Sequence, residues 1–314
     1  MHAIAVGSWG GPDVLEEVTL PRPEPGPTEI LVAVHAAGVN ATDWKARATG
    51  GFDLWGDPVV LGYDVSGVVE AVGPGASLFE PGDEVFGMPR FPEQAGAYAE
   101  YVAAPSHHFA RRPVGIDHIH AAALPLVGLT AWQALSEVGR VEAGQRVLIH
   151  AAAGGLGHVA VQIAKALGAQ VIGTASAAKH AFLRSLGADE LIDYTEVDFA
   201  EAVTGVDVVL DAIGGDYARR SLRTLRSGGT LISLTSPAEP DAETVAAARE
   251  RGIHTGFTLV EPDRAGMLAI AELVEAGKLR VEIADVLPLS EARRAHELGE
   301  TRRTTGKLVL RVRD

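Results

Sequence analysis

The feature that most constrains the fold is an alternation of strand and helix patterns that begins after Gly144. Short apolar and β-branched segments suited to strands are separated by stretches with helical spacing. This alternation predicts a doubly wound α/β fold with a parallel sheet. The expected strands are 146–150, 170–175, 190–193, 206–211 and 230–234, and the expected helices are 156–167, 179–186 and 217–225.

The first of these strands runs into the glycine-rich segment AAAGGLG, residues 151–157. Ala152, Gly154 and Gly157 occupy the three positions of a G-x-G-x-x-G motif, with alanine in place of the first glycine. In this motif the middle glycine lets the backbone approach a pyrophosphate, and the helix that follows directs its free amides at the phosphates. The turn is therefore predicted to bind a dinucleotide through Ala152, Gly154, Gly155, Leu156 and Gly157. The alternative is a turn of small residues that binds no ligand.

The end of the second expected strand indicates which dinucleotide is bound. Sheets that bind NAD usually carry Asp or Glu here, which accepts hydrogen bonds from the ribose hydroxyls. No acid occurs from Gln170 to Ser185, whereas Ser176 and Lys179 stand just past the strand end. A hydroxyl and an ammonium would hold a 2′-phosphate, so the sequence predicts NADPH. A solvated lysine at position 179 is the alternative.

The first third of the chain has a β-rich pattern. Strands are expected over 29–39, 64–73 and 97–103, with Gly and Pro turns between them, which is typical of a barrel-like or sandwich-like domain. Beyond about residue 256 the alternation weakens. Helices are expected over 264–276 and 292–298 and a last strand over 306–312, and periodicity alone leaves open whether this tail is a third unit or returns to the first domain.

Composition excludes several classes of protein. The chain of 314 residues has no cysteine, so disulfides and Cys-ligated zinc are excluded. A net charge of −14 disfavours a nucleic-acid surface. The longest apolar runs are too short to span a membrane, and the first eleven residues lack the basic start of a secretion signal. A cytoplasmic protein without nucleic-acid or membrane partners is therefore expected.

Five stretches in order along the chain carry a resemblance to a known family. They are HAAGVNATDWKAR (35–47), VLGYDVSGVVEAVGPG (60–75), LPLVGLTAWQAL (124–135), VLIHAAAGGLGHVAVQIAKALGA (147–169) and SLGADELIDY (185–194). By these stretches the chain resembles the medium-chain dehydrogenase/reductase superfamily, in particular its zinc-independent quinone oxidoreductase branch, which includes zeta-crystallin. The resemblance implies a GroES-like β-barrel catalytic domain (1–118) interrupted by a Rossmann NADPH-binding domain (119–258), with 259–314 returning to the catalytic domain.

The same resemblance addresses the metal. The zinc alcohol dehydrogenases of this superfamily have Cys at the position held here by Asn40 and a His-Glu pair at Tyr63-Asp64. A catalytic zinc needs about three protein ligands. No metal is therefore expected, and hydride transfer to an acceptor that is already electrophilic is favoured over zinc-assisted alcohol oxidation.

The resemblance also implies individual site residues. Asn40 is placed near the nicotinamide and the acceptor, and Thr130 near the nicotinamide ribose or carboxamide, although a local turn role for Asn40 and a backbone hydrogen bond from Thr130 fit equally well. Tyr194 is placed against the 2′-phosphate ribose, with ordinary packing as the alternative. Strand-end loops and a segment that flanks the nicotinamide supply the remaining cofactor contacts: Ile213, Gly214, Leu234, Phe257 and Thr258.

Tyr63 occupies the position of the zinc histidine. Its hydroxyl could polarise the acceptor oxygen, with packing in the barrel as the alternative interpretation. If the hydroxyl takes part, Tyr63→Phe lowers turnover and leaves NADPH affinity unchanged. Trp44, Phe52 and Trp55 lie in one stretch and either wall an aromatic acceptor pocket or form part of the small-domain core.

Three functions fit these residues. The first is a zinc-independent NADPH:quinone reductase. The second is an NADPH-dependent enone or enoyl double-bond reductase, which could act in a biosynthetic pathway. The third is a non-catalytic NADPH-binding protein of the crystallin or redox-sensing kind. The resemblance further implies a homodimer or homotetramer that pairs near Ile253–Thr258, where an unpaired edge strand would otherwise be exposed.

Overall fold

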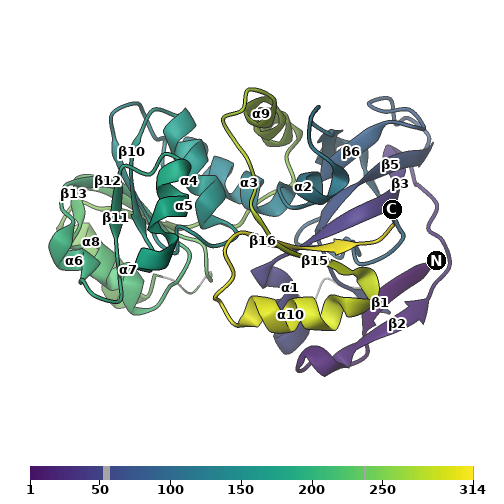
Figure 1. The fold of residues 1–314 in the computed structure, drawn as a ribbon, viewed down its shortest axis with the longest axis horizontal. Helices are drawn as coiled ribbons and strands as arrows, with labels where there is room; N and C mark the ends of the chain where they lie inside the picture. Colours follow the sequence, from purple (N-terminus) through teal and green to yellow (C-terminus); the bar gives the residue numbers. More distant parts are fainter. Residues whose placement is uncertain (52–56, 237, 239, 314) are drawn as a thin grey trace. The chain divides into compact units, whose positions relative to one another are not determined.

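A computed structural model describes residues 1–51, 57–236, 238 and 240–313. The chain divides into two compact units (Figure 1). The first comprises Met1–Leu129, Glu261–Gly277 and Val281–Asp314, and the second Thr130–Val260 and Lys278–Arg280. The first boundary lies at 129/130 rather than at 118/119, because the short helix α2 (His118–Ala122) packs on strands of the first unit. The second boundary lies at 260/261.

The second unit contains a parallel sheet of six strands. Counted along the chain, its strands stand in the order third, second, first, fourth, fifth, sixth, which is the order of doubly wound dinucleotide-binding sheets. Every neighbouring pair is parallel, so the carboxyl ends of all six strands meet at one edge. In spatial order the strands are β11 (Glu190–Ile192), β10 (Gln170–Thr174), β9 (Arg146–Ile149), β12 (Val206–Asp211), β13 (Leu225–Ser233) and β14 (His254–Phe257).

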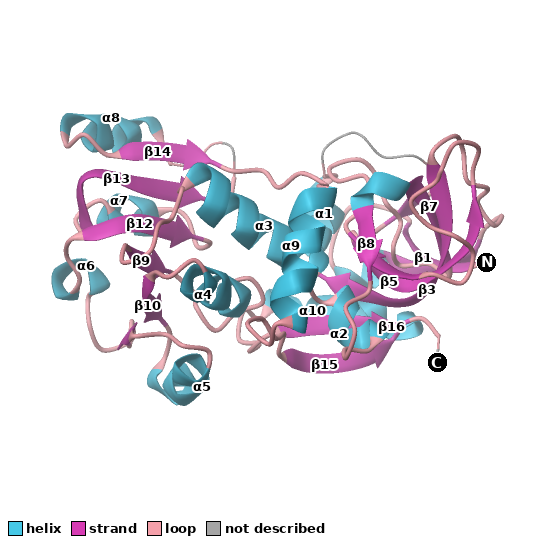
Figure 2. Cartoon of the chain, turned by 90° about the horizontal axis from the view of Figure 1, so that it is seen from above, coloured by secondary structure: helices cyan, strands magenta, loops and turns pink. Residues whose placement is uncertain are grey.

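Helices alternate with these strands (Figure 2). They are α4 (Gly157–Ala166), α5 (His180–Ser185), α6 (Phe199–Ala202), α7 (Asp216–Ser221) and α8 (Ala242–Glu250). The helix predicted over 217–225 ends at Ser221, because β13 already begins at Leu225, five residues before the predicted strand 230–234. Helices α6 and α8 were not among the predicted elements, and each begins at an aspartate cap, Asp198 or Asp241. Strand β14 lies where the resemblance implies an edge strand, near Ile253–Thr258.

Among the described residues, the first unit has a large, mostly antiparallel sheet and a small one. β3 is central to the large sheet, pairing β5 along one edge and β7 and β16 along successive parts of the other. The strand expected over 97–103 begins only at Tyr101. The large sheet contains β15 (Ile283–Pro288), β16 (Lys307–Arg311), β3 (Glu29–Val39), β5 (Asp64–Val72), β6 (Glu84–Gly87), β8 (Phe109–Arg111) and β7 (Tyr101–Pro105), and the small one β2 (Leu15–Thr19), β1 (His2–Val6) and β4 (Val59–Val60).

The tail of the chain belongs to the first unit. β16 pairs antiparallel with β3, with Leu308 opposite Val39, and β15 runs parallel to β16. The first residue of β16, Lys307, therefore lies beside the end of β3. The remaining helices are α1 (Ala41–Thr49), α3 (Pro125–Trp132), a π-helical turn (Gln133–Val138), α9 (Arg264–Glu275) and α10 (Ala292–Glu300), with single 3₁₀ turns at Pro12–Val14, Ser106–His108, Ala177–Lys179 and Leu289–Glu291. In the described part of the chain, no helix has the length and apolar character to cross a membrane.

Candidate active site

The glycine-rich turn joins β9 to α4 at the carboxyl edge of the parallel sheet. Its path is fixed by backbone hydrogen bonds from the Ala152 N–H to the Thr174 carbonyl (3.0 Å) and from the Gly154 N–H to the Ala151 carbonyl (2.9 Å). A Cβ on Gly157 would lie 2.3 Å from the carbonyl oxygen of Ala151, so only glycine fits there. The turn therefore brings the start of α4 against its own strand, as the motif predicts.

The alanine at the first motif position is accommodated by the neighbouring strand. The Ala152 side chain is fully buried, and a Cβ on Gly173 of β10 would come within 2.9 Å of the Ala152 Cβ. The Ala152 methyl group, which a glycine at this motif position would lack, thus fills the space left by Gly173 on the next strand. The departure from three glycines is compensated locally and does not disrupt the turn.

The turn presents unpaired amides at the N-terminus of α4. Among the described residues, the backbone N–H groups of Gly155 and Leu156 have no acceptor. The buried His158 ring lies on the inner side, where its Nδ1 is 2.8 Å from the Gly154 carbonyl and donates to it. Open amides at the positive end of a ten-residue helix form a site for an anion such as a pyrophosphate.

The end of β10 carries the residues predicted to hold a 2′-phosphate. Ser176 precedes the 3₁₀ turn that ends at Lys179, and burial lowers the pKa of the Lys179 ammonium. Tyr194 follows β11 on the neighbouring strand, and 51% of its surface is exposed. Sequence analysis missed the carboxylate of Asp193, which accepts hydrogen bonds from the Ala177 N–H (2.9 Å) and the Thr195 hydroxyl (2.6 Å). The Asp193 carboxylate thus joins the loop after β11 to the turn after β10 that carries Ser176 and Lys179.

The strand ends of β12, β13 and β14 bring together the other predicted cofactor residues. The Asp211 carboxylate at the end of β12 accepts hydrogen bonds from the N–H groups of Ile213 (2.9 Å) and Gly214 (3.0 Å). The Leu234 N–H donates to the Asp211 carbonyl (2.9 Å), and the Thr258 N–H donates to the Ser233 carbonyl (3.0 Å). With Phe257, which pairs with Ser233 at the end of β14, these residues lie along one edge of the sheet.

In the first unit, Asn40 is the centre of a buried polar cluster. Its Nδ2 donates to Asp64 Oδ2 at 2.8 Å, and the Lys307 ammonium donates to Asn40 Oδ1, to the Val39 carbonyl (3.0 Å) and to Asp64 Oδ2 (3.3 Å). Side-chain exposure is 2% for Lys307 and 0% for Asp64. The other oxygen of Asp64 accepts the Leu126 N–H at 2.7 Å. Asp64 thus makes structural hydrogen bonds to Asn40 and Leu126, together with an ion pair to Lys307.

Lys307 is a second residue of the candidate site that the sequence pattern does not indicate. In the sequence it only opens the last predicted strand, 267 residues beyond Asn40. The close approach of Asp64 to β3 requires Gly38, where a Cβ would lie 2.6 Å from Asp64 Oδ2 and 2.4 Å from the Ala122 carbonyl oxygen. No local pattern signals such a contact, because β16 reaches β3 only through the folded sheet.

A second buried network adjoins Asn40 on helix α1. Asp43 Oδ2 accepts the Asn40 backbone N–H (2.7 Å) and the Tyr98 hydroxyl (3.1 Å). The Tyr98 oxygen lies 3.2 Å from His296 Nε2, and His296 Nδ1 lies 3.2 Å from the guanidinium of Arg47. Because arginine can only donate, Nδ1 is an acceptor and Nε2 carries the proton. Burial raises the pKa of the Asp43 carboxyl to about 7 and lowers the pKa of His296 to about 3.

Tyr63 does not present an open hydroxyl. The side chain is 2% exposed, its hydroxyl donates to the Pro92 carbonyl at 3.2 Å, and its ring packs edge-on against Phe91 at 4.8 Å between centroids. These contacts favour packing in the barrel over a role in polarising the acceptor.

The other predicted residues belong to different parts of the chain. Thr130 is buried in α3 and belongs to the second unit, whereas Asn40 and Tyr63 belong to the first. Trp44 packs against α10, with its ring 6.3 Å from the His296 ring, and joins the core of the first unit, which favours the core interpretation over a pocket wall. Phe52 and Trp55 lie outside the described residues.

The first unit's polar cluster does not fit a zinc ion. At the positions that correspond to zinc ligands, the Asn40 amide is engaged by Asp64 and Lys307, and the Tyr63 hydroxyl is engaged by Pro92. The Lys307 ammonium beside Asp64 would repel a divalent cation. Within the part of the chain that the structure describes, no three His, Asp or Glu side chains are grouped to hold a metal.

Comparison with known proteins places this geometry in a family. The alcohol dehydrogenase GroES-like domain matches residues 26–114, and a zinc-binding dehydrogenase model matches residues 186–310. The 2-haloacrylate reductase of a Burkholderia species is 35% identical over 98% of this chain and 98% of its own length. The chain belongs to the medium-chain dehydrogenase/reductase superfamily. Within it, the chain is a member of the zinc-independent quinone oxidoreductase branch.

Solved structures agree with this assignment. The quinone oxidoreductase of Coxiella burnetii superimposes with a TM-score of 0.92 at 40% identity, covering 100% of this chain and 99% of that one. The Escherichia coli quinone oxidoreductase complexed with NADPH gives a TM-score of 0.89 at 30% identity, covering 99% and 100%. A segment of the pikromycin polyketide synthase component PikAII of Streptomyces venezuelae is 37% identical over 92% of this chain, which spans only 8% of that protein. The predicted Rossmann and GroES-like fold is confirmed.

Proposed function

We propose that this protein is an NADPH-dependent oxidoreductase that transfers hydride to a quinone without a metal. The observation that carries the proposal is the strand, turn and helix over residues 146–166, with the open amides of Gly155 and Leu156 at the helix start. The Coxiella and Escherichia coli relatives named as quinone oxidoreductases, one of them complexed with NADPH, support both the reaction and the cofactor.

The residues of the second unit are assigned to cofactor binding. The turn at 152–157 holds the pyrophosphate, and the absence of an acid after β10 leaves Ser176 and Lys179 to hold the 2′-phosphate, with Tyr194 beside them. The strand-end residues Ile213, Gly214, Leu234, Phe257 and Thr258 line the remaining path of the dinucleotide. Bound NADPH supplies a hydride from its nicotinamide ring. Asn40 and Thr130 orient the reacting groups by hydrogen bonds that carry no charge.

A second candidate acceptor is an activated carbon–carbon double bond. The 2-haloacrylate reductase relative and the polyketide synthase segment favour it, because a haloacrylate is an electron-poor alkene. The same hydride donor and the same metal-free site serve this reaction. The acceptor is thus a small electrophile in both cases.

The test is the loss of absorbance of reduced nicotinamide with purified protein, NADPH or NADH, and one simple para-quinone. We expect rapid oxidation with a strong preference for NADPH. Equal use of NADH would contradict the assignment of Ser176 and Lys179 to the 2′-phosphate, but the proposed reductase activity would still hold. Oxidation only with 2-chloroacrylate or an enone would select the second candidate, and NADPH binding without any oxidation would indicate a non-catalytic binding protein.

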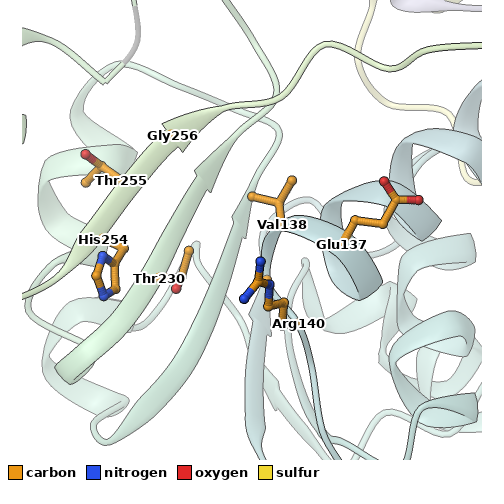
Figure 3. A pocket seen from close by; sticks show the side chains of 8 residues that line it. Glu137, Val138, Arg140, Thr230, His254, Thr255 and Gly256 are labelled. Atoms are coloured by element: carbon orange, nitrogen blue, oxygen red, sulfur yellow. The ribbon is translucent and has the colours of Figure 1, made fainter.

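We also propose that β14 pairs with a second copy of the chain. β14 is the last strand of the parallel sheet, so one of its edges is unpaired within the described residues. A surface pocket of about 520 Å³ lies beside this strand, lined by Glu137, Val138 and Arg140 on one side and by Thr230, His254 and Thr255 on the other (Figure 3). None of these residues is assigned to the cofactor. Light scattering after gel filtration should give a dimer or tetramer, and a monomer would refute the pairing. The cytoplasmic location stays a prediction from the sequence.

A further inference from the structure

The two ends of the Asn40 side-chain amide face partners with opposite hydrogen-bonding character. An ammonium can only donate, so Lys307 requires an oxygen, and a carboxylate can only accept, so Asp64 requires an N–H. Lys307 contacts Asn40 Oδ1, and Asp64 lies 2.8 Å from Asn40 Nδ2. A flipped amide would set donor against donor and acceptor against acceptor. The pair therefore fixes one orientation of the amide.

This orientation determines what Asn40 can offer to a ligand. Its oxygen is occupied by Lys307 and one N–H by Asp64, which leaves the second N–H of Nδ2 without an acceptor among the described residues. Asn40 is 4% exposed, so it is nearly enclosed. The group that remains is a hydrogen-bond donor, and its complement is an oxygen such as the carbonyl of a quinone or enone.

The charges around the amide are balanced. The ammonium of Lys307 and the carboxylate of Asp64 lie 3.3 Å apart with almost no solvent exposure, so the ion pair is neutral as a whole. The ion pair polarises the amide, because the Lys307 ammonium lies at its oxygen and the Asp64 carboxylate at its nitrogen. It places no net charge beside the acceptor. Its other contacts, to the Val39 carbonyl and the Leu126 N–H, anchor it to the backbone at the end of β3 and in α3.

We propose that Asp64 and Lys307 are positioning residues that hold Asn40 as a hydrogen-bond donor to the carbonyl oxygen of the acceptor. The inference rests on the proposed function. As the acceptor receives the hydride and its electron pair, NADPH is oxidised to NADP⁺ and negative charge gathers on the carbonyl oxygen, which then takes a proton from water. A donor already oriented toward that oxygen stabilises the charge as it develops. The contribution should matter most for acceptors of low intrinsic electrophilicity.

The test is the double variant Asp64→Asn with Lys307→Met, which removes both charges together and avoids leaving one of them buried alone. Turnover is measured with a series of para-benzoquinones whose substituents run from electron-withdrawing to electron-donating. We expect kcat to fall more than tenfold with the electron-rich quinones and much less with the electron-poor ones. The dissociation constant of NADPH, measured without acceptor, should stay within about twofold of the wild-type value, since the cofactor residues are untouched.

The matched control is Lys165→Met with Asp189→Asn, which removes an ion pair of 2.8 Å in the second unit, outside the assigned site. The proposal would be overturned if the double variant at 64 and 307 showed the same dependence of kcat on quinone substituents as this control. It would also be overturned if kcat fell equally with all quinones and NADPH affinity was weakened. If the double variant does not fold, Asn40→Ala removes the donor alone and should give the same steeper dependence on electrophilicity, whereas an unchanged dependence would overturn the proposal. Absence of wild-type turnover with every quinone and enone would instead refute the proposed function.

Discussion

The hydroxyl of Tyr98 lies 3.1 Å from Oδ2 of Asp43, and both side chains are fully shielded from solvent. The same oxygen accepts the backbone N–H of Asn40, so two donors converge on one carboxyl oxygen. Asp43 Oδ1 is buried and has no partner among the described residues. Burial is the largest cause that raises the Asp43 pKa from 3.8 to about 7, and these hydrogen bonds only partly oppose it.

This raised pKa predicts how stability depends on pH. The folded state holds the Asp43 proton up to about pH 7 and the unfolded state only to about pH 4, so the group's favourable contribution is complete below pH 4 and lost by about pH 7. Asp43→Asn keeps an oxygen for both donors and does not titrate. We predict that the free energy of unfolding of the variant, relative to the wild type, rises by about 4 kcal/mol from pH 4 to pH 8.

Urea unfolding at pH 4, 6 and 8 measures this difference. Tyr98→Phe removes the hydroxyl that donates to Asp43 and keeps the carboxyl, so its stability should still fall as the pH rises. The fall should extend to a higher pH, because the Tyr98 hydrogen bond lowers the Asp43 pKa. A difference between Asp43→Asn and the wild type that stays constant with pH would show that Asp43 is ionised throughout.

The contact between the glycine-rich turn and β10 predicts a pair of compensating substitutions. In Gly173→Ala the new Cβ would lie 2.9 Å from the Ala152 Cβ and 3.1 Å from a methyl of Leu191. We expect a loss of about 1–3 kcal/mol in the free energy of unfolding and weaker NADPH binding. Adding Ala152→Gly removes one of the two clashes and should recover part of both losses. Strictly additive effects in the double-mutant cycle would contradict this coupling.

The assignment of the 2′-phosphate site predicts a change in cofactor preference. In Lys179→Ala, we expect KM for NADPH to rise about tenfold or more while KM for NADH stays unchanged, since only NADPH carries the phosphate that the ammonium would hold. Steady-state kinetics with both cofactors and one quinone measures the ratio. Lys278→Ala, a lysine elsewhere in the second unit, serves as the control. Equal losses with NADH and NADPH would place Lys179 outside the phosphate site.

The contacts of Tyr63 predict a structural effect in place of a catalytic one. Tyr63→Phe leaves the half-buried Pro92 carbonyl without this donor, which should lower the free energy of unfolding by about 1 kcal/mol. Turnover with a quinone below the unfolding temperature should equal that of the wild type. Thermal unfolding and initial rates on the same preparation separate the two effects, and a large fall in kcat with unchanged stability would return Tyr63 to the chemistry.

The parts of the molecule that the sequence predicts are those whose cause is local. The turn at 151–157 follows from the strand before it, the helix after it and the small residues between, all within about twenty positions. The compensation between Ala152 and Gly173 depends on two parallel strands being neighbours, and the contact of Lys307 with Asn40 depends on β16 pairing with β3. Such contacts between distant segments leave no periodic signal in a single sequence.

The place of Tyr63 shows the same limit from the opposite side. Its position in the family pattern suggested a catalytic hydroxyl, but the partner of that hydroxyl is a backbone carbonyl 29 residues away, which only the folded loop reveals. Asp43 is a further example, because an aspartate in the first turn of a helix is ordinary and its burial against Tyr98 is not visible in the pattern.

The insertion of β16 beside β3 has a consequence for the order of synthesis. All six strands of the parallel sheet precede residue 258, so they leave the ribosome before Lys307 is translated. The first unit includes residues 1–129, yet its sheet receives β15 and β16 only after the whole parallel sheet has been translated. Asp64 and Asn40 are therefore translated long before Lys307, whose ammonium pairs with them. During synthesis the cofactor-binding sheet is therefore complete before the cluster of Asn40, Asp64 and Lys307 can form, and a chain interrupted between residues 258 and 307 lacks this cation.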